Sequence, residues 1–215
     1  MASSPELISA GAVQRIIGVL AIIFPPMLVI GGLLDGKGIL QPSLSEYYYT
    51  YMSPFFVGTL FAIGMMFFAY KGYATNHGPI PLSDNMLANI AGVSSIGVAV
   101  VPSGSCPFTS NPLLSNLHTG LAGVMLFAMA CFCLFYFTQS SPQHLSRNKS
   151  KRNMIYRGCG ATIFICLFFC LLHILTREAS CVYPVRSTPI LWLEWIMIWA
   201  FGLAWLVKSE IILQD

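Results

Sequence analysis

Positions 12–34 read AVQRIIGVLAIIFPPMLVIGGLL, an apolar run that contains one charged residue, Arg15. A helix needs about 20 apolar residues to cross the roughly 30 Å hydrocarbon core of a bilayer, so this run is long enough to span it. Backbone polar groups in lipid must be bonded within the membrane segment, and the run lacks the alternating polar pattern of a barrel strand. A membrane-spanning α-helix is therefore expected.

Comparable apolar runs recur along the 215-residue chain. We place them at 54–70, 86–101, 117–137, 155–175 and 190–207. Hydrophobic residues make up 56% of the chain and charged residues only 9%, a balance typical of a protein that is solvated mainly by lipid. The predicted fold class is all-α: an integral membrane bundle of six transmembrane helices, forming a single domain over residues 1–215.

The basic residues predict an orientation, because Lys and Arg near the ends of spans are retained on the cytoplasmic side. With both termini cytoplasmic, that side holds eight of the 11 Lys and Arg residues and the outside holds three. The densest group forms a predicted cytoplasmic basic anchor of Arg147, Lys149, Lys151 and Arg152. The expected location is a plasma membrane or bacterial inner membrane, with membrane lipids as partners and no nucleic acid.

Ionisable side chains within the spans gather near the predicted outer face. His118 opens the fourth span, His173 lies near the end of the fifth, Glu194 lies about one turn into the sixth, and Glu46 precedes the second. Ionisable groups are costly in lipid, so function is the default hypothesis for them. Two imidazoles and a carboxylate can ligate zinc and leave a position open for water. The sequence predicts an outward-facing pocket with His118, His173 and Glu194 as metal ligands.

This pocket favours a metal-assisted lipid hydrolase or a lipid-binding protein, with a lipid or small molecule as its ligand. Arg177 follows His173 by four residues, so the two are expected on one helix face. The predicted catalytic residues are Glu194, Glu46 and Ser45, and the predicted pocket also includes Arg177, Tyr47 and Tyr48.

Three other functions stay open at this point. His118 and His173 are candidates for paired axial ligands of a haem b. Glu194 and the histidines are candidates for a proton-linked site in a small-molecule transporter. A non-catalytic receptor or assembly factor would instead use Glu194 in an ion pair, for example with Arg177, and the tyrosines in an interfacial aromatic belt.

Two cysteines fall in loops that the predicted topology places outside. An oxidising environment there would permit a disulfide between Cys106 and Cys181. Two separate thiols are the alternative, because a sequence does not establish the Cα separation that a disulfide requires.

Helix packing also has signals in the sequence. Ala91, Ser95 and Ala99 recur at every fourth position, a pattern that lets neighbouring helix backbones approach closely. Pro25 and Pro26 are expected to bend or break the first span, because proline lacks the N–H that an interior helix position donates.

Several motifs are distributed over most of the chain: SEYYYT at 45–50, FVG at 56–58, YKGY at 70–73, NIAG at 89–92 and RNMIYRGCG at 152–160. In these motifs the chain resembles a family of uncharacterised bacterial multi-pass membrane proteins with about six helices. The resemblance implies a helical membrane fold and carries no catalytic residues with it.

A looser likeness is to the membrane hydrolase superfamily of alkaline ceramidases and progestin-type receptors, which use a Ser, an Asp and several His around zinc. Ser45, His118 and His173 match parts of that set. The last span has no HxxxH, the outer groups include no Asp, and the chain has one helix too few. No roles are carried over from this superfamily.

Overall fold

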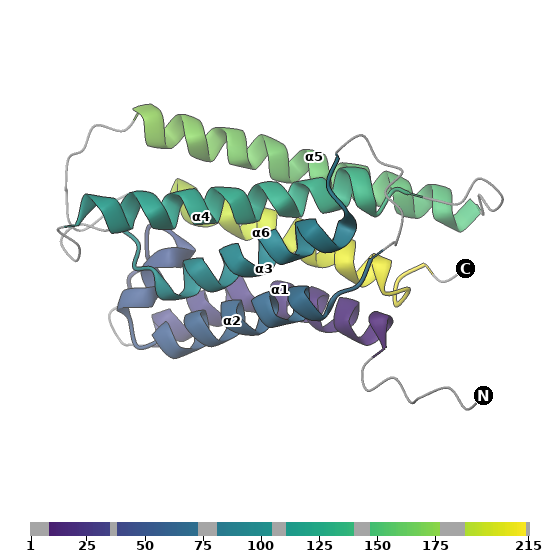
Figure 1. The fold of residues 1–215 in the computed structure, drawn as a ribbon. Coiled ribbons are helices and arrows are strands. Elements are labelled where there is room, and N and C mark those ends of the chain that lie inside the picture. Colours follow the sequence, from purple (N-terminus) through teal and green to yellow (C-terminus); the bar gives the residue numbers. More distant parts are fainter. Residues whose placement is uncertain are drawn as a thin grey trace.

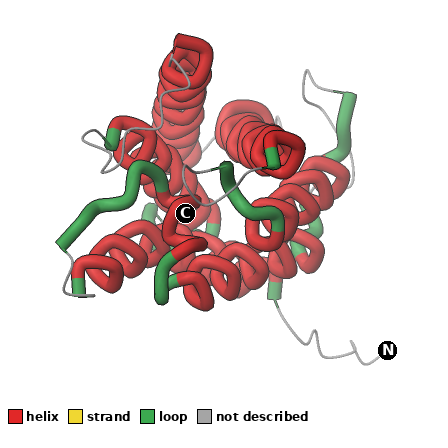
Figure 2. The backbone as a smooth tube through the Cα atoms, turned by 90° about the vertical axis from the view of Figure 1, so that its left-hand side faces the viewer, coloured by secondary structure: helices red, strands yellow, loops and turns green. Residues whose placement is uncertain are grey.

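The computed structural model describes residues 9–34, 38–72, 81–104, 111–139, 147–176 and 188–213. Within these ranges the chain forms helices and loops and no strand (Figure 2). The predicted all-α class is confirmed. The helices are α1 (Ala10–Leu33), α2 (Ser53–Ala69), α3 (Asp84–Val100), α4 (Pro112–Cys131), α5 (Arg147–Thr176) and α6 (Pro189–Lys208), with a 3₁₀ helix η1 (Leu44–Tyr49) before α2 and a π-helical segment η2 (Phe132–Tyr136) that continues α4.

Four helical segments in the described part of the chain are long and apolar enough to cross a membrane. They are Ala10–Leu33, Pro112–Tyr136, Asn148–Thr176 and Pro189–Lys208. The helix α2 is apolar but has only 17 residues, and α3 also has 17. A membrane protein is therefore indicated, while the six-span count and the orientation stay predictions.

The helices alternate in direction along the bundle, so α1 begins and α6 ends at the same end (Figure 1). The helix α6 packs between α1 and α5, and α3 packs between α2 and α4. The opposite end contains η1, the end of α3, the start of α4, the end of α5 and the start of α6, and we call it the η1 end.

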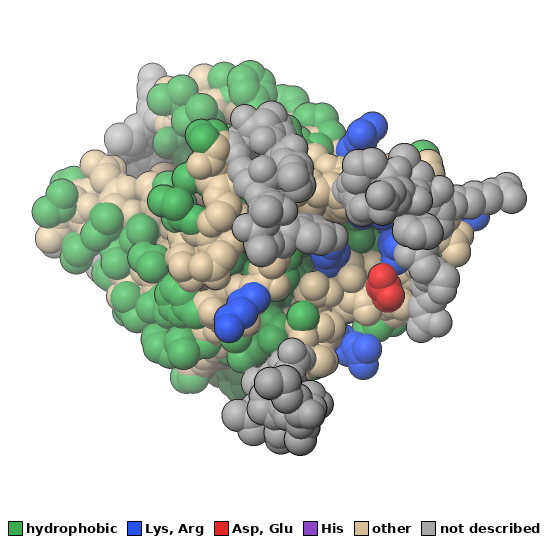
Figure 3. Space-filling view, turned by 45° about the vertical axis from the view of Figure 1, so that its right-hand side comes forward, with side chains coloured by type: hydrophobic (Ala, Val, Ile, Leu, Met, Phe, Trp, Pro, Cys, Tyr) green, Lys and Arg blue, Asp and Glu red, His purple; other side chains and the backbone are tan. Residues whose placement is uncertain are grey.

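The outer surface of the bundle is largely apolar. Hydrophobic side chains, in green, cover much of the face in Figure 3. The Lys and Arg side chains of that face, in blue, lie toward the end of the bundle where α1 begins and α6 ends. Large apolar residues such as Ile30, Phe168 and Leu175 expose half or more of their surface. An exposed apolar surface of this kind is expected where lipid surrounds a protein.

The two prolines do not break α1, which continues through Pro25 and Pro26 as one helix. Because Pro26 has no N–H, the carbonyl of Ile22 loses the donor that a regular helix would supply. The indole Nε1 of Trp199 donates to that carbonyl at 2.9 Å. A side chain of α6 thus satisfies the backbone group that the proline leaves unbonded, as the lipid environment requires.

We expect Trp199→Phe to destabilise the bundle by roughly 1–2 kcal/mol, because it keeps an aromatic ring but removes the donor to Ile22. Thermal unfolding of the purified protein in detergent measures the change. Trp192→Phe is the matched control, since Trp192 is also on α6 and is 49% exposed. Equal unfolding temperatures for the two variants would contradict the proposed role of the Trp199 indole.

The small-residue stripe on α3 packs as predicted. Ala91, Ser95 and Ala99 are completely buried, and the Ser95 hydroxyl donates to the carbonyl of Leu60 on α2 at 2.8 Å. A Cβ added at Gly64 of α2 would come within 3.0 Å of a carbonyl oxygen of α3. The α2 and α3 backbones therefore approach closely.

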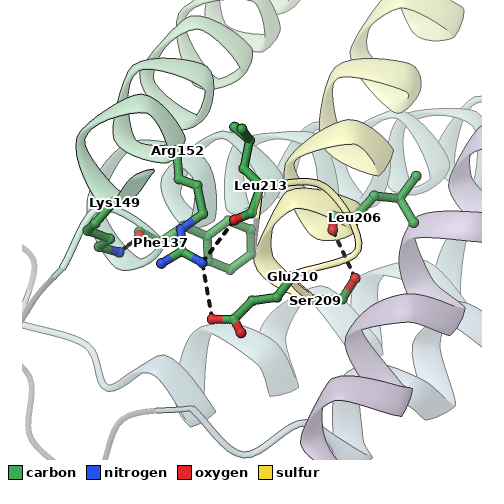
Figure 4. A network of polar contacts seen from close by, with 7 residues as sticks. All are labelled: Phe137, Lys149, Arg152, Leu206, Ser209, Glu210 and Leu213. Atoms are coloured by element: carbon green, nitrogen blue, oxygen red, sulfur yellow. Dashed lines mark hydrogen bonds and ion pairs between the residues drawn. The ribbon is translucent and has the colours of Figure 1, made fainter. Parts of the chain in front are cut away.

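The predicted basic anchor forms the first turns of α5, which begins eight residues before the predicted span because Lys and Arg are good helix formers. Lys149 donates to the carbonyl of Phe137 at 3.0 Å. Arg152 is only 5% exposed and donates to the Glu210 carboxylate at 3.1 Å and to the carbonyl of Leu213 at 3.4 Å (Figure 4). Arg152 therefore ties α5 to the segment after α6, a structural role that the sequence did not indicate.

The other two anchor residues are Lys151 and Arg147. The Lys151 side chain is exposed on the surface of the bundle. The side chain of Arg147 lies outside the described part of the structure.

Candidate functional site

A cavity of about 260 Å³ lies at the η1 end. It is built by η1, the loop after α3, residues 115–126 of α4, the first turns of α6 and the last turns of α5. Its polar residues include Ser45, Glu46, Ser103, His118 and Glu194. Four residues that the sequence indicated, Ser45, Glu46, His118 and Glu194, are thus brought together around one cavity.

The central feature of the cavity is a contact between Ser45 and His118. The His118 Nδ1 atom lies 2.6 Å from the carbonyl oxygen of Val101, and Nε2 lies 2.9 Å from the Ser45 hydroxyl. A carbonyl oxygen only accepts hydrogen bonds, so Nδ1 carries the proton of the neutral ring and Nε2 is the acceptor. The Ser45 hydroxyl therefore donates to His118, which is the arrangement of a nucleophile beside a general base.

Three elements hold this pair in place. Ser45 is the second residue of η1, and Val101 is the residue that follows α3. His118 is 4% exposed and lies on α4, whose start is set by Pro112 and by the Asn111 side chain, which accepts from the N–H of Leu113 at 3.0 Å. Proline at the first helical position and asparagine at the cap both favour a helix start there.

Glu46 and Ser103 connect η1 to the loop after α3. The Ser103 hydroxyl donates to the Glu46 carboxylate at 3.4 Å. The Tyr49 hydroxyl donates to the carbonyl of Ser103. These contacts hold Val101, two residues earlier, where its carbonyl can orient the imidazole.

Glu194 holds the segment that leads into Ser45. Its carboxylate accepts from the N–H of Leu44 at 2.7 Å, and the N–H of Leu191 donates to the carbonyl of Pro42 at 3.1 Å. The first two turns of α6 are therefore bonded to the backbone on the N-terminal side of Ser45. The Glu194 carboxylate, predicted as a catalytic group and metal ligand, thus contacts the backbone beside Ser45.

The predicted metal site is not assembled. Among the described residues no group of three or more His, Cys, Asp or Glu side chains is placed to hold a metal ion. Both ring nitrogens of His118 already have partners, and the Glu194 carboxylate is bonded to the backbone. The zinc prediction therefore has no support, and a haem b on His118 would require one of these contacts to break.

His173 does not line the cavity, although it lies at the same end of the bundle. The α5 residues that do line it are Leu167, Cys170, Leu171 and Ile174. These positions form one face of the helix, and His173 falls beside that face. The depth of His173 was inferred correctly from the sequence, but the rotation of α5 about its axis was not.

The two tyrosines assigned to the pocket also lie elsewhere. Tyr47 is completely buried and packs on Gly32 of α1, and the Tyr48 ring packs edge-on against Phe56. A 3₁₀ helix has three residues per turn, so successive residues of η1 point in different directions. Burial raises the pKa of the Tyr47 phenol further above its ordinary value, which already lies well above neutral pH.

Three predicted residues lie outside the described part of the structure: Arg177, Cys106 and Cys181. Among the groups that orient the Ser45–His118 pair, two were missed by the sequence reasoning. The Ser103 hydroxyl had no spacing or depth signal, and the carbonyl of Val101 is a backbone group that every residue carries. Only the folded arrangement distinguishes them.

Beyond the polar residues, the cavity continues as an apolar groove between two helices. The wall on α4 consists of Thr119, Ala122, Gly123 and Leu126, and the wall on α5 consists of Leu167, Cys170, Leu171 and Ile174. Each set follows the spacing of one helix face. Leu171 is 53% exposed and Ile174 is 50% exposed, so the groove reaches the apolar outer surface. We call it the α4–α5 groove.

Comparison with known proteins gives no match: no family model, no curated protein and no solved structure is similar to this chain. The resemblance to bacterial multi-pass membrane proteins therefore stays a prediction.

Proposed function

We propose that this protein is a membrane hydrolase in which Ser45 is the nucleophile and His118 is the general base. The observation that supports this most directly is the 2.9 Å contact between the Ser45 hydroxyl and His118 Nε2. The opposite ring nitrogen is held by the carbonyl of Val101 at 2.6 Å, so the base has an orienting group. A carboxylate has that role in many serine hydrolases, and a backbone carbonyl takes its place here.

The substrate we propose is an ester of an amphiphile. The cavity is polar around Ser45 and apolar along the α4–α5 groove. A lipid-like molecule would place its reacting ester beside Ser45 and its hydrocarbon chain between α4 and α5. The exposed edge of the groove would let such a molecule enter from the bilayer.

Besides the ester, water is the only substrate that this reaction requires. The Ser45 oxygen bonds to the ester carbonyl carbon while His118 Nε2 takes the hydroxyl proton. The bond between that carbon and the alcohol oxygen breaks, and the imidazolium returns the proton to the alcohol. A water molecule, deprotonated by His118, then attacks the acyl-serine, which releases the carboxylic acid and restores the Ser45 hydroxyl.

We further propose that the η1 end faces the outside of a plasma membrane or bacterial inner membrane. Lys71 follows α2, Lys208 ends α6 and Arg152 lies in the first turns of α5, so these cations belong to the opposite end of the bundle. Cations near span ends favour the cytoplasmic side. The cavity would then be reached from the outer leaflet.

The test is covalent labelling of the full-length protein in lipid nanodiscs with an alkyl fluorophosphonate, a probe that reacts with activated serines. We expect one adduct per chain, mapped to Ser45 by peptide mass spectrometry, and none in Ser45→Ala. Ser150→Ala is the control, because Ser150 is an exposed serine in the first turn of α5, far from the cavity in sequence and at the other end of the bundle.

An adduct on other serines, or none, would contradict the proposed chemistry. A lipid that copurifies with the protein in the absence of any adduct would instead support a lipid-binding protein without catalysis. That alternative uses the same amphipathic cavity and needs no reactive hydroxyl.

A further inference from the structure

A second, smaller cavity lies on the core side of Ser45. Its volume is about 30 Å³, and we call it the inner pocket. It shares Ser45, Ala122, Leu126 and Glu194 with the larger cavity. The rest of its wall includes the buried apolar side chains of Phe24, Phe56, Leu60, Val98, Met125 and Ile198.

We propose that the inner pocket receives the acyl group that is transferred to Ser45 and limits it to about the size of an acetyl group. This inference rests on the proposed hydrolase function. The inner pocket, at about 30 Å³, is far smaller than the 260 Å³ cavity beside it. One water molecule needs roughly 10–15 Å³ of such space, so the inner pocket has room for a group of a few atoms and not for a long hydrocarbon chain. Apart from Ser45 and Glu194 the wall is apolar, so burying a charged acyl group there would be costly.

Ser45 lies at the junction of the two cavities, which suits an ester with one small side and one large side. The α4–α5 groove takes the alcohol with its long apolar chain, and the inner pocket takes the acyl carbon and its methyl group. The substrate class is therefore an acetyl ester of an amphiphilic alcohol. Attack by Ser45 forms acetyl-serine and releases the alcohol; water then releases acetate and restores the hydroxyl.

Much of the wall of the inner pocket comes from packed helices rather than from loops. Phe24 comes from α1, Leu60 from α2 and Val98 from α3, and each is at most 3% exposed. Close-packed interiors do not expand freely to admit extra atoms. The volume of the inner pocket should therefore limit the length of the acyl chain that can react.

The experiment compares three esters with the full-length protein in nanodiscs: octyl acetate, octyl hexanoate and methyl nonanoate. We expect kcat/KM for octyl acetate to exceed that for octyl hexanoate by at least roughly tenfold, the discrimination that a single methylene can give in an apolar pocket. Methyl nonanoate tests the reverse orientation, with the long chain on the acyl side. A preference for methyl nonanoate would overturn the inference.

Leu60→Ala should enlarge the inner pocket and lower the ratio of acetate to hexanoate hydrolysis by roughly tenfold. The matched control is Ile63→Ala, since Ile63 lies one turn further along α2, is equally buried at 3% and lines neither cavity. Val98→Ala provides a second enlarged pocket if Leu60→Ala does not fold. Equal ratios in these enlarged-pocket variants and in Ile63→Ala would overturn the inference.

The two proposals fail in different ways. If the fluorophosphonate forms no adduct on Ser45 of the wild-type protein, the hydrolase function and the acyl-pocket inference are overturned together. An intact Ser45 adduct with no preference between octyl acetate and octyl hexanoate would overturn the acyl-pocket inference and leave the hydrolase function standing.

Discussion

Replacing His118 by glutamine is expected to slow the reaction of Ser45 with a fluorophosphonate by at least about 100-fold, the usual contribution of a positioned general base. The glutamine amide can still donate a hydrogen bond toward the carbonyl of Val101, but it cannot take a proton from Ser45. The second-order rate constant for adduct formation measures the effect. Thermal unfolding in the same buffer reports whether the fold is kept.

A purely structural role for His118 is distinguished by chemical rescue. In His118→Ala the side chain is removed and a space is left next to Ser45. Added imidazole should partly restore the labelling rate if His118 acts as a base. Unchanged labelling in His118→Gln, or a loss in His118→Ala that imidazole does not relieve, would contradict the assignment.

Glu194→Ala is expected to slow labelling of Ser45 by roughly tenfold and to lower the free energy of unfolding by about 1–3 kcal/mol. The variant removes the acceptor of the Leu44 N–H, and a buried donor without a partner costs about that much free energy. It also releases the backbone next to the nucleophile, and a small displacement of a reacting group can slow a reaction by as much as about 100-fold.

Glu194→Gln is the matched variant, because the amide oxygen can accept the same hydrogen bond without a negative charge. Labelling rate and unfolding temperature are expected to stay close to wild type in Glu194→Gln and to fall in Glu194→Ala. Equal losses in both variants would contradict the positioning role of Glu194.

The helices themselves were predictable because apolar length is a property of the residues. The run at 12–34 became α1, and of the bend or break expected at its prolines the break does not occur, since the helix continues through both. Trp199 of another helix donates to the carbonyl that Pro26 leaves unbonded. The start of α5 was missed, since a hydropathy argument ends where the basic residues begin and those residues are themselves good helix formers.

The membership of the site was predictable in part. Spans that alternate in direction bring every second loop to one end, so the depths of Ser45, Glu46, His118 and Glu194 could be assigned from the sequence. The zinc hypothesis also required that the side chains of the predicted ligands point toward one another. His173 lies beside the face of α5 that lines the cavity, and the ring nitrogens of His118 are bonded to other partners.

The sequence by itself determined that this chain forms apolar helices suited to a bilayer and that its ionisable groups collect toward one end. Only the tertiary structure decided that His118 contacts Ser45, that Glu194 holds the backbone of Leu44, and that a groove opens between α4 and α5. The reason is physical: span length and depth follow from the apolarity of each segment, whereas the direction of each side chain depends on how the helices rotate about their axes when they pack.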